Sequence, residues 1–338
     1  MEDSKFPAVM TDLSKAYLGE GEKRELKEGE LLVKVHSAPV HPADQGFCRG
    51  YYGDKKQLKD QHYGCGFEGA GEVLEVGPNT EPTLKGKRVA LFQGIEDPNY
   101  EGTYRKYLYI MANRVVAFPD DADYDMIACA NGNPMTICGF VDICQKSKHT
   151  AIINDAACSA CGRILIKACK HYGIKLINLV RKAEQVKILE DMGADAVLNY
   201  SEDEFPEKLS KVIEEFKPTG YFTCVSGEVA SYVFSSMPNH STMYVYGFLS
   251  MESITYEPKD ILFRSQSISH FWLPVWINSL TQEESEKWIK EIGVDISSGG
   301  EVFGTKIGKT FKLDQFSEAM TYARKNGSEG KTIIRPQE

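Results

Sequence analysis

The chain has 338 residues, of which 42% are hydrophobic and 26% charged, and it carries a formal net charge of −9 at pH 7. A chain of this size and composition can bury two hydrophobic cores, so two domains are expected. The acidic balance argues against a surface built for nucleic acid or anionic lipid, because either partner requires a concentrated basic field.

The first residues, MEDSKFPAVMTDL, show neither a basic segment followed by an apolar run nor an Arg-rich transit pattern. No stretch approaches the roughly 20 apolar residues of a membrane span. We therefore expect a soluble, cytoplasmic protein, or a mitochondrial one from which a transit peptide has been removed. The nine cysteines form no small-domain disulfide framework, which favours a reducing compartment.

Residues 31–118 contain short β-like runs separated by glycine and proline turns, namely LLVKVHSAPV, GEVLEVG, RVALFQG and YRKYLYIM. Strands and helices do not alternate here, so an irregular β-rich domain is predicted. One connection, RGYYGDKKQLKDQHYGCGFEG, is too long for a hairpin and is a candidate site loop.

From about residue 120 the pattern changes. The stretch from Ala122 to Lys146 has helical character, and strands then alternate with helices. The predicted strands are TAIIND, KLINLV, AVLNY, GYFTCV and TMYVYGF, and the predicted helices are CGRILIKACKHYG, AEQVKILEDMG and PEKLSKVIEEF. This alternation predicts an α/β fold with a doubly wound parallel sheet.

The last part of the chain returns to a mixed pattern. SISHFWLPVWINS is aromatic and apolar, TQEESEKWIKEIGVDISSG predicts a surface helix, and KTFKLDQFSEAMTYARKNG followed by GKTIIRP predicts strand, helix and strand. The first and last segments are therefore expected to form one domain, with the nucleotide fold inserted between them. The predicted boundaries are 1–118, 119–262 and 263–338.

The stretch NDAACSACGR places Cys158 and Cys161 between a predicted strand and a predicted helix. A tight turn of small residues there lets backbone N–H groups at a helix N-terminus meet a pyrophosphate. The pattern Ala156-x-x-Ser159-x-x-Gly162 lacks the strict G-x-G-x-x-G and is weak by itself. A thioredoxin-like dithiol or half of a zinc site are the alternatives. No aromatic residue precedes the first cysteine and no second CxxC or His pair follows, so the nucleotide turn ranks first.

Arg181 and Lys182 follow the second strand of this unit directly. In a Rossmann unit an acidic residue at this strand end binds the free 2′-hydroxyl of NAD, whereas Arg or Lys accommodates the 2′-phosphate of NADP. NADP is therefore favoured. The alternative is that the two basic residues only solvate the strand end.

With these motifs in place, the chain resembles the medium-chain dehydrogenase/reductase superfamily, in its zinc-independent branch of quinone oxidoreductases and 2-enoyl thioester reductases. The segments that carry the resemblance cover nearly the whole chain: VHSAPVHPADQGFCRGYYG, GCGFEGAGEVLEVG, KGKRVALF, NGNPMTICGF, NDAACSACGR through LVRKAEQ, GADAVLNY, YVYGFLS, HFWLPVWINS and GKTIIRP. The resemblance implies a Rossmann NADP-binding domain and a β-rich GroES-like catalytic domain.

The zinc-dependent alcohol dehydrogenases of this superfamily carry a Gly-His-Glu at the catalytic metal. Here that place reads Gly66-Phe67-Glu68, and phenylalanine cannot bind a metal ion. The segment RVALFQGIEDPNYEGTYRKY lacks the cysteines of a structural zinc lobe. The resemblance therefore predicts no zinc.

The resemblance also implies a cofactor site for NADPH. The cysteines and small residues of the turn would line the pyrophosphate, the basic pair would bind the 2′-phosphate, and Tyr200 would lie beside it. An aromatic run is more often core or subunit interface than cofactor site, which weighs against Phe271 and Trp272. The full set of implied cofactor residues is Asn133, Thr136, Cys158, Ser159, Ala160, Cys161, Arg181, Lys182, Tyr200, Tyr246, Gly247, Phe248, Leu249, Phe271, Trp272, Leu273 and Lys331.

Two residues are implied as catalytic. Tyr52 falls where the enoyl reductases carry a tyrosine thought to help protonate the substrate, although a tyrosine that only packs on the cofactor is an open alternative. His41 stands where the branch usually has asparagine, so it is either a proton donor or a hydrogen-bonded structural histidine.

The resemblance thus predicts an NADPH-dependent enzyme that transfers hydride to a quinone, an enone or an enoyl thioester. The alternative is a cofactor-binding, non-catalytic subunit of a larger assembly. A third possibility is a redox-sensing dithiol at Cys158 and Cys161. The branch commonly forms homodimers through an edge strand of the nucleotide domain, and TMYVYGF is compatible with that edge.

Overall fold

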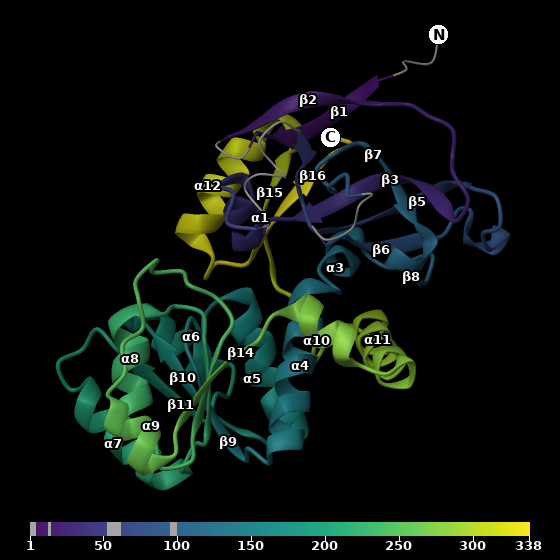
Figure 1. Cartoon of the computed structure of the whole chain (residues 1–338). Coiled ribbons are helices and arrows are strands. Elements are labelled where there is room, and N and C mark those ends of the chain that lie inside the picture. The colour runs from purple at the N-terminus through teal and green to yellow at the C-terminus, as the bar shows by residue number, and fades with distance from the viewer. Residues whose placement is uncertain (1–4, 13–14, 53–61, 95–99) are drawn as a thin grey trace. The chain divides into compact units, whose positions relative to one another are not determined.

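The computed structural model describes residues 5–12, 15–52, 62–94 and 100–338, and it divides the chain into two compact units (Figure 1). The β-rich unit comprises Met1–Pro134 and Lys290–Glu338, and the nucleotide unit comprises Met135–Ile289. The sequence placed these boundaries at 118/119 and 262/263. They differ because α3 (Tyr124–Ala128) packs against strands of the β-rich unit, while β14 (Ser267–His270) pairs with a strand of the nucleotide unit.

The nucleotide unit contains a six-stranded sheet in the order β11-β10-β9-β12-β13-β14, with every neighbouring pair parallel. This is the strand order of the doubly wound dinucleotide-binding fold. Its strands are β9 (Ala151–Asn154), β10 (Lys175–Val180), β11 (Ala196–Asn199), β12 (Gly220–Thr223), β13 (Thr242–Val245) and β14. The edge is therefore β14 and not TMYVYGF, because β13 has a hydrogen-bonded strand on each side.

Helices cover both faces of this sheet, with α7, α8 and α9 grouped on one face and α4 and α5 on the other (Figure 1). The helix α8 was not anticipated from the sequence. The bounds are α4 (Gly132–Ser147), α5 (Ala160–Tyr172), α6 (Ala183–Asp191), α7 (Phe205–Phe216), α8 (Gly227–Ser236), α9 (Pro258–Arg264), α10 (Leu273–Ser279) and α11 (Gln282–Ser297).

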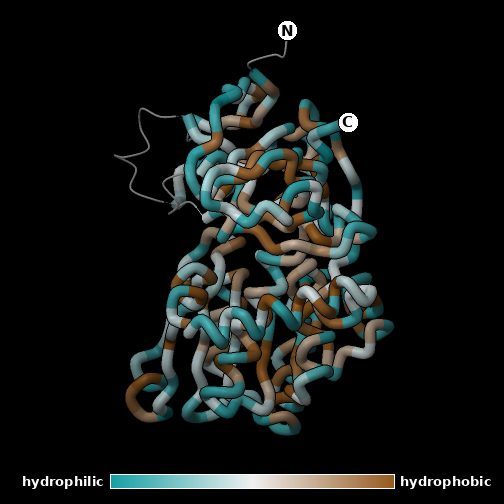
Figure 2. The backbone as a smooth tube through the Cα atoms, turned by 90° about the vertical axis from the view of Figure 1, so that its right-hand side faces the viewer, coloured by the Kyte–Doolittle hydropathy of each residue, from teal (hydrophilic) through white to brown (hydrophobic). Residues whose placement is uncertain are grey.

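The core of the nucleotide unit lies between the sheet and its helices. Helix α7 buries Phe205, Leu209 and Ile213, which recur every four residues and so form one apolar face. They join a cluster that includes Ile177 and Tyr221, both fully buried on central strands. Figure 2 shows the same arrangement as hydrophobic segments inside and hydrophilic turns outside. Strands covered on both faces explain the continuous apolar runs in the sequence.

The β-rich unit is built around β3 (Glu30–Pro39), which pairs with β5, β7 and β16. The larger sheet runs β15-β16-β3-β5-β6-β8 with β7 beside β3, and a small sheet runs β2-β1-β4. The other strands are β1 (Lys5–Thr11), β2 (Ala16–Glu22), β4 (Tyr63–Gly64), β5 (Glu68–Val76), β6 (Arg88–Phe92), β7 (Tyr107–Met111), β8 (Val115–Phe118), β15 (Ile307–Lys312) and β16 (Lys331–Arg335).

Helices of the β-rich unit are α1 (Pro42–Cys48), α3 and α12 (Phe316–Asn326), with short 3-10 turns at Pro82–Leu84, Ala112–Arg114 and Leu313–Gln315. The antiparallel pairing of β16 with β3 joins the end of the chain to its beginning, with Ile333 opposite Pro39. This register brings the start of β16 beside the start of α1.

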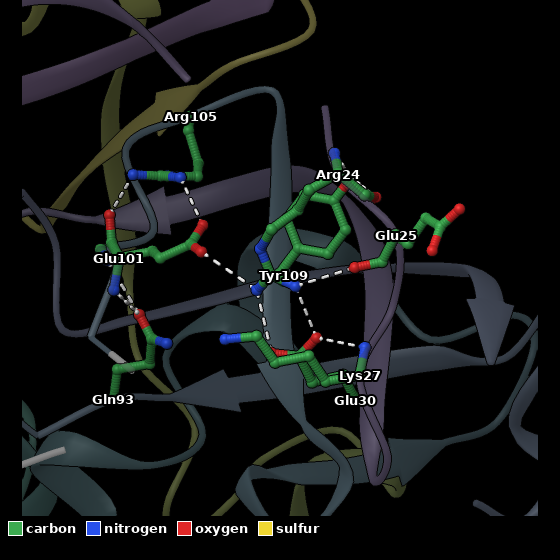
Figure 3. Close-up of polar contacts among 9 residues, drawn as sticks. Arg24, Glu25, Lys27, Glu30, Gln93, Glu101, Arg105 and Tyr109 are labelled. Atoms are coloured by element: carbon green, nitrogen blue, oxygen red, sulfur yellow. Dashed lines mark hydrogen bonds and ion pairs between the residues drawn. The ribbon is translucent and has the colours of Figure 1, made fainter. Parts of the chain in front are cut away.

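A network of buried and half-buried charged side chains holds the segment 100–105 of the β-rich unit in place (Figure 3). Arg24 donates two hydrogen bonds to the carboxylate of Glu30, at 2.6 and 2.9 Å, and stacks 4.1 Å over the Tyr109 ring. Glu101 accepts from Arg24 at 3.4 Å and from Arg105 at 2.6 Å. Bidentate and shared guanidinium contacts are strongly directional, so they hold the segment 100–105 in place.

No helix in the described parts of the chain is long and apolar enough to cross a membrane. All nine cysteines lie in those parts, and none of them forms a disulfide bond.

Candidate active site

The predicted nucleotide turn follows β9 and is anchored by Asp155. This buried carboxylate accepts hydrogen bonds from the hydroxyls of Tyr221 and Thr223 and from the backbone N–H groups of Cys224 and Val225. Burial raises the pKa of Asp155, and these four donors offset part of the increase. The next residue, Ala156, has φ +48°, a left-handed conformation that is uncommon for a residue with a side chain. The turn is therefore held in shape by its neighbours.

Helix α5 starts at this turn, and Ser159 is its N-cap. The Ser159 hydroxyl accepts a hydrogen bond from the Gly162 N–H at 3.1 Å. A Cβ at Gly162 would lie 2.4 Å from the Ala157 carbonyl oxygen, so only glycine permits this close approach. The helix N-terminus carries partial positive charge and directs its first N–H groups outward, which suits an anion.

The two cysteines of the CxxC differ in their surroundings. Cys158 is buried, and its Sγ accepts a hydrogen bond at 3.4 Å from Arg163, whose Nε also donates to the Cys158 carbonyl at 3.2 Å. Cys161 is partly exposed on the first turn of α5. The Cys158 thiol therefore serves the packing of the turn, while the turn itself is formed by backbone.

The end of β10 carries the basic pair. Arg181 and Lys182 are both exposed, and their backbone N–H groups donate to the Gln185 side chain at 3.3 and 3.2 Å. Burial raises the pKa of the nearby Tyr200 phenol, and the positive charge of Arg181 opposes that increase. The Tyr200 N–H donates to the Val180 carbonyl at 3.0 Å, so Tyr200 lies beside the strand end that Arg181 follows.

The segment after β13 lies beside the nucleotide turn. The Tyr246 hydroxyl donates to Asn154 Oδ1 at 3.3 Å, and the Gly247 carbonyl accepts from Ser226 at 3.0 Å. The Asn154 Nδ2 atom is buried and has no hydrogen-bond partner among the described residues. Phe248 and Leu249 are exposed, at 47% and 53%.

The aromatic run after β14 has a different role from the turn residues. Phe271 is buried against Phe140, with ring centroids 5.0 Å apart, and its ring closely approaches Gly139. It packs with Trp276 as part of the unit's core. Trp272 is 49% exposed and Leu273 is half-buried. Phe271 was implied as a cofactor residue, but the contacts that its ring makes are with core residues of the nucleotide unit.

Three residues of the β-rich unit form a second cluster. His41 Nε2 lies 2.5 Å from Glu68 Oε1, and Lys331 Nζ lies 2.8 Å from His41 Nδ1. The other Glu68 oxygen accepts from the Gly132 N–H at 2.5 Å. Glu68 is 1% exposed and Lys331 is 6% exposed. We call His41, Glu68 and Lys331 the HEK cluster.

The hydrogen bonds of the HEK cluster fix the histidine tautomer. A lysine ammonium only donates, so His41 Nδ1 accepts from Lys331 and Nε2 carries the proton that it donates to Glu68. Burial by itself would raise the pKa of Glu68, but His41, Lys331 and the Gly132 N–H outweigh it and hold that pKa below its usual value. Glu68 is therefore a buried carboxylate that orients the His41 ring and the Gly132 N–H through its two oxygen atoms.

Tyr52 lies just beyond α1 in an aromatic cluster with Phe67, at 6.2 Å between ring centroids, and Phe67 contacts Tyr100 at 5.9 Å. Burial raises the pKa of Tyr52, and the charge of Asp44 adds to the increase. Asp44 is fully buried and accepts from the Tyr104 hydroxyl at 2.7 Å and from the His41 N–H at 2.6 Å. Of the candidate loop 49–69, residues 53–61 lie outside the described part of the chain.

The remaining predicted cofactor residues lie at the start of α4. Asn133 belongs to the β-rich unit and Thr136 to the nucleotide unit, and both are half-buried. Within the described residues, no three His, Cys, Asp or Glu side chains come together as a metal site would need.

Two family models match this chain. The model described as alcohol dehydrogenase GroES-like domain matches residues 27–120, and the model described as zinc-binding dehydrogenase matches residues 160–291. The mitochondrial enoyl-[acyl-carrier-protein] reductase of Arabidopsis thaliana is 27% identical over 270 residues, which cover 78% of this chain and 70% of that protein. A structure from Mesorhizobium loti assigned as an NADPH:quinone reductase is 26% identical, with a TM-score of 0.85 over 99% of this chain and 100% of that one.

The chain belongs to the medium-chain dehydrogenase/reductase superfamily, in its zinc-independent quinone oxidoreductase and enoyl reductase branch. The fold is also that of the Escherichia coli quinone oxidoreductase complexed with NADPH, with a TM-score of 0.82 at 20% identity over 98% of this chain and 100% of that one. The predicted fold class, a Rossmann domain with a GroES-like domain, is confirmed.

Two residues and one contact of this reductase-family chain were missed by the sequence reasoning. Glu68 was read only as part of a motif that had lost a metal-binding histidine, although a buried glutamate kept in that motif was a usable signal. Asp155 ends a predicted strand, and an acidic residue at that position could have suggested a hydrogen-bond acceptor that fixes the neighbouring loop. The proximity of Lys331 to His41 had no local signal, because 290 residues separate them.

Proposed function

We propose that this chain is an NADPH-dependent reductase that transfers hydride to a quinone or to the activated C=C bond of an enone or enoyl thioester. The family supports the reaction class, since relatives carry the names enoyl-[acyl-carrier-protein] reductase and NADPH:quinone reductase. The observation that carries the cofactor choice is the exposed pair Arg181 and Lys182, which directly follows β10 where NAD-binding folds carry an acidic residue. Glu184 lies two residues further on and pairs with Lys182 at 3.5 Å.

The residues of the nucleotide unit fit NADPH. The N-terminus of α5, capped by Ser159 and packed closely through Gly162, suits the pyrophosphate. Arg181 and Lys182 would hold the 2′-phosphate. When bound, NADPH supplies the hydride. Asn133, Thr136, Tyr246, Gly247, Phe248 and Leu249 remain proposed cofactor contacts.

Tyr52 is the proposed proton donor. Hydride addition to an activated alkene leaves an enolate on the substrate, which a phenol can stabilise or protonate. A phenol is protonated at neutral pH, and burial raises the pKa of Tyr52 further, so Tyr52 would act as a hydrogen-bond donor to the enolate oxygen and give up its proton only to a strongly basic enolate oxygen or carbon. The neighbouring Phe67 and Tyr100 form an apolar surround that suits a substrate ring or a conjugated alkene.

His41 is proposed to act through Lys331. Both of its ring nitrogens are engaged in the HEK cluster, so donating a proton to the substrate would break one of two short hydrogen bonds. We propose instead that His41 keeps both hydrogen bonds and holds the Lys331 ammonium in place. The positive charge of Lys331 would then stabilise the negative charge that develops on the substrate, or bind the cofactor.

A substrate panel tests the proposal. Purified protein is mixed with NADPH or NADH and with quinones, enones and enoyl thioesters, and oxidation of the cofactor is followed at 340 nm. We expect turnover of at least one class, with NADPH preferred over NADH. Tight NADPH binding without oxidation by any substrate would instead support a non-catalytic subunit.

We also propose a homodimer formed through β14. All four residues of this edge strand are exposed, and apolar side chains surround it, including Leu262 at 71%, Phe263 at 79% and Trp272 at 49%. An exposed edge strand with apolar flanks is suited to pairing with a second copy. Light scattering should give twice the chain mass of 37.8 kDa, and Ile268→Lys on β14 should reduce it to the monomer mass.

A mitochondrial location is proposed, because the enoyl-[acyl-carrier-protein] reductase of Arabidopsis thaliana named above is described as mitochondrial, and a cytoplasmic location is the alternative. Fluorescence of a C-terminally tagged chain, compared with a mitochondrial marker, would distinguish the two.

A further inference from the structure

Cys48 and Cys65 form a thiol pair that no sequence motif connects. Cys48 is the last residue of α1, and Cys65 directly follows β4. Their Sγ atoms lie 3.7 Å apart, although the two cysteines are 17 positions apart in the chain. Both side chains belong to one apolar cluster with Val9 and Tyr104.

The geometry allows this pair to close into a disulfide. A disulfide bond is about 2.05 Å long, so the sulfur atoms would have to approach by roughly 1.7 Å. The Cys65 backbone is fixed on both sides, since its N–H donates to the Val9 carbonyl at 3.0 Å and its carbonyl accepts from the Tyr104 N–H at 2.8 Å. Rotation of the Cys48 side chain and a shift at the end of α1 would therefore provide the approach.

The two thiols differ in reactivity. Cys48 is 7% exposed and Cys65 is 1% exposed, so Cys48 is the member that a small oxidant reaches. A hydrogen bond from Cys65 lowers the pKa of Cys48, against the effect of burial, whereas that same bond and burial raise the pKa of Cys65. Cys48 is thus the better thiolate, and the thiolate is the form that reacts with peroxides.

We propose that Cys48 and Cys65 form a reversible disulfide on exposure to a hydroperoxide, and that this cross-link lowers the activity of the reductase. The Cys48 thiolate attacks the peroxide O–O bond, giving a sulfenic acid and releasing hydroxide or alkoxide. The Cys65 thiol then attacks the sulfenic sulfur, forming the S–S bond and releasing water. Two thiols are oxidised and one peroxide is reduced, and a dithiol reductant reverses the change.

The cross-link acts on the proposed proton donor. Tyr52 follows α1 by four residues, and its ring packs so closely on α1 that a Cβ at Gly46 would lie 2.8 Å from it. On the other side, Cys65 precedes Phe67 and Glu68. A shift of about 1 Å in a catalytic group is enough to cost roughly 100-fold in rate, so a displaced α1 should slow turnover at least tenfold. This consequence rests on the proposed function, but the cross-link does not.

Mass spectrometry of the full-length protein tests the cross-link. The protein is treated with hydrogen peroxide near equimolar amounts, denatured in N-ethylmaleimide and digested without reduction. We expect seven of the nine cysteines to be alkylated and one peptide pair to join Cys48 to Cys65. A disulfide at another pair, Cys158 with Cys161 included, or a Cys48 sulfinic acid with no cross-link, would overturn the proposal.

Three single variants provide controls for the peptide map. Cys48→Ala and Cys65→Ala should retain no cross-link, whereas Cys144→Ala, which removes an equally buried cysteine outside the pair, should still form it. The wild-type map decides the question even if the Cys65 variant does not fold.

Activity is measured on the same samples. Oxidised wild type should turn over its substrate at least tenfold more slowly than reduced protein and should recover in dithiothreitol, while Cys65→Ala should keep its rate in peroxide. A cross-linked protein with an unchanged rate would overturn the effect on activity. A reduced protein that turns over no substrate would instead overturn the proposed function, while the peptide map still decides the cross-link.

Discussion

The nucleotide turn and the HEK cluster are sites of two different kinds. The turn consists of consecutive residues, and its chemistry resides in backbone N–H groups at the start of α5, with Ser159 and Gly162 shaping them. The HEK cluster consists of three side chains, one at the N-cap of α1, one on β5 and one on β16, and His41 and Lys331 are 290 positions apart in the chain. A backbone site tolerates changes of side chain, provided that small residues such as the alanine and serine of this turn stand in place of glycines. A buried side-chain cluster depends on each member.

The largest effect is expected from Glu68→Gln, because it leaves the HEK cluster without its negative charge. The amide can accept from His41 or from Gly132 but then directs its NH₂ at the other donor, and breaking a buried charge pair costs about 3 kcal/mol or more. Urea unfolding measures the loss. Glu75→Gln, at an exposed position on the same strand, should change stability by less than about 0.5 kcal/mol.

The difference in unfolding free energy between wild type and Glu68→Gln should depend on pH. The folded pKa of Glu68 is lowered, so its contribution to stability is present above the unfolded value of about 4.3 and is lost as the pH falls through the folded value. The stability gap between wild type and Glu68→Gln should therefore narrow below about pH 4. A gap that stays constant down to pH 3 would show that the charge of Glu68 is not what stabilises the cluster.

Tyr52→Phe should reduce turnover of enones by roughly 100-fold, since it removes the proposed proton donor. The NADPH dissociation constant, followed by quenching of protein fluorescence, should not change. Tyr51→Phe, at the exposed neighbouring tyrosine, serves as the matched control and should keep the wild-type rate. Equal rates for Tyr52→Phe and wild type would remove the role assigned to this phenol.

Arg181→Ala should raise the KM for NADPH by about tenfold or more and leave the KM for NADH unchanged, because a charge-assisted contact to phosphate contributes roughly 1.5–3 kcal/mol. Steady-state kinetics with both cofactors measures the change. Lys187→Ala removes an exposed charge from α6 that pairs with Asp191, and it should affect neither KM. A parallel rise in both KM values would mean that Arg181 only stabilises the strand end.

The smallest effect is expected from Ser159→Ala. Loss of the N-cap hydrogen bond to Gly162 should lower the free energy of unfolding by about 1 kcal/mol, while the backbone turn still binds NADPH. Ser298→Ala, at an exposed serine beyond α11, is the control. A large loss of NADPH affinity in Ser159→Ala would show that NADPH binding depends on the Ser159 hydroxyl and not on backbone N–H groups alone.

The sequence predicted much of the nucleotide unit because its signals are local. Runs such as TAIIND and KLINLV became β9 and β10, and the helix that ends at Gly173 became α5, with that glycine at φ +71°. The helix α8 was missed. Its N-cap residue Ser226 makes no side-chain capping hydrogen bond, and Ser226 and Gly227 both have positive φ, so the chain enters this helix in an uncommon conformation. The unit boundary near residue 263 also differed, because the pairing of β14 is a tertiary contact.

In the β-rich unit the sequence located His41, Tyr52 and Lys331 through the family pattern, but it did not show how they are connected. The choice between a proton donor and a structural histidine at His41 depends on what its two nitrogens contact. That required the register of β16 on β3, which brings Lys331 to α1.

The sequence alone predicted the alternating sheet and the turn of small residues before α5, because hydrophobic periodicity and turn residues act over a few positions, and its resemblance to known segments along nearly the whole chain indicated the superfamily. Only the tertiary structure decided which side chains meet. It showed that Cys158 serves packing beside Arg163, that His41 lies between Glu68 and Lys331, and that Cys48 and Cys65 are the thiols in contact. Such contacts join residues distant in the chain, and their positions follow from strand register and core packing, which no local pattern records.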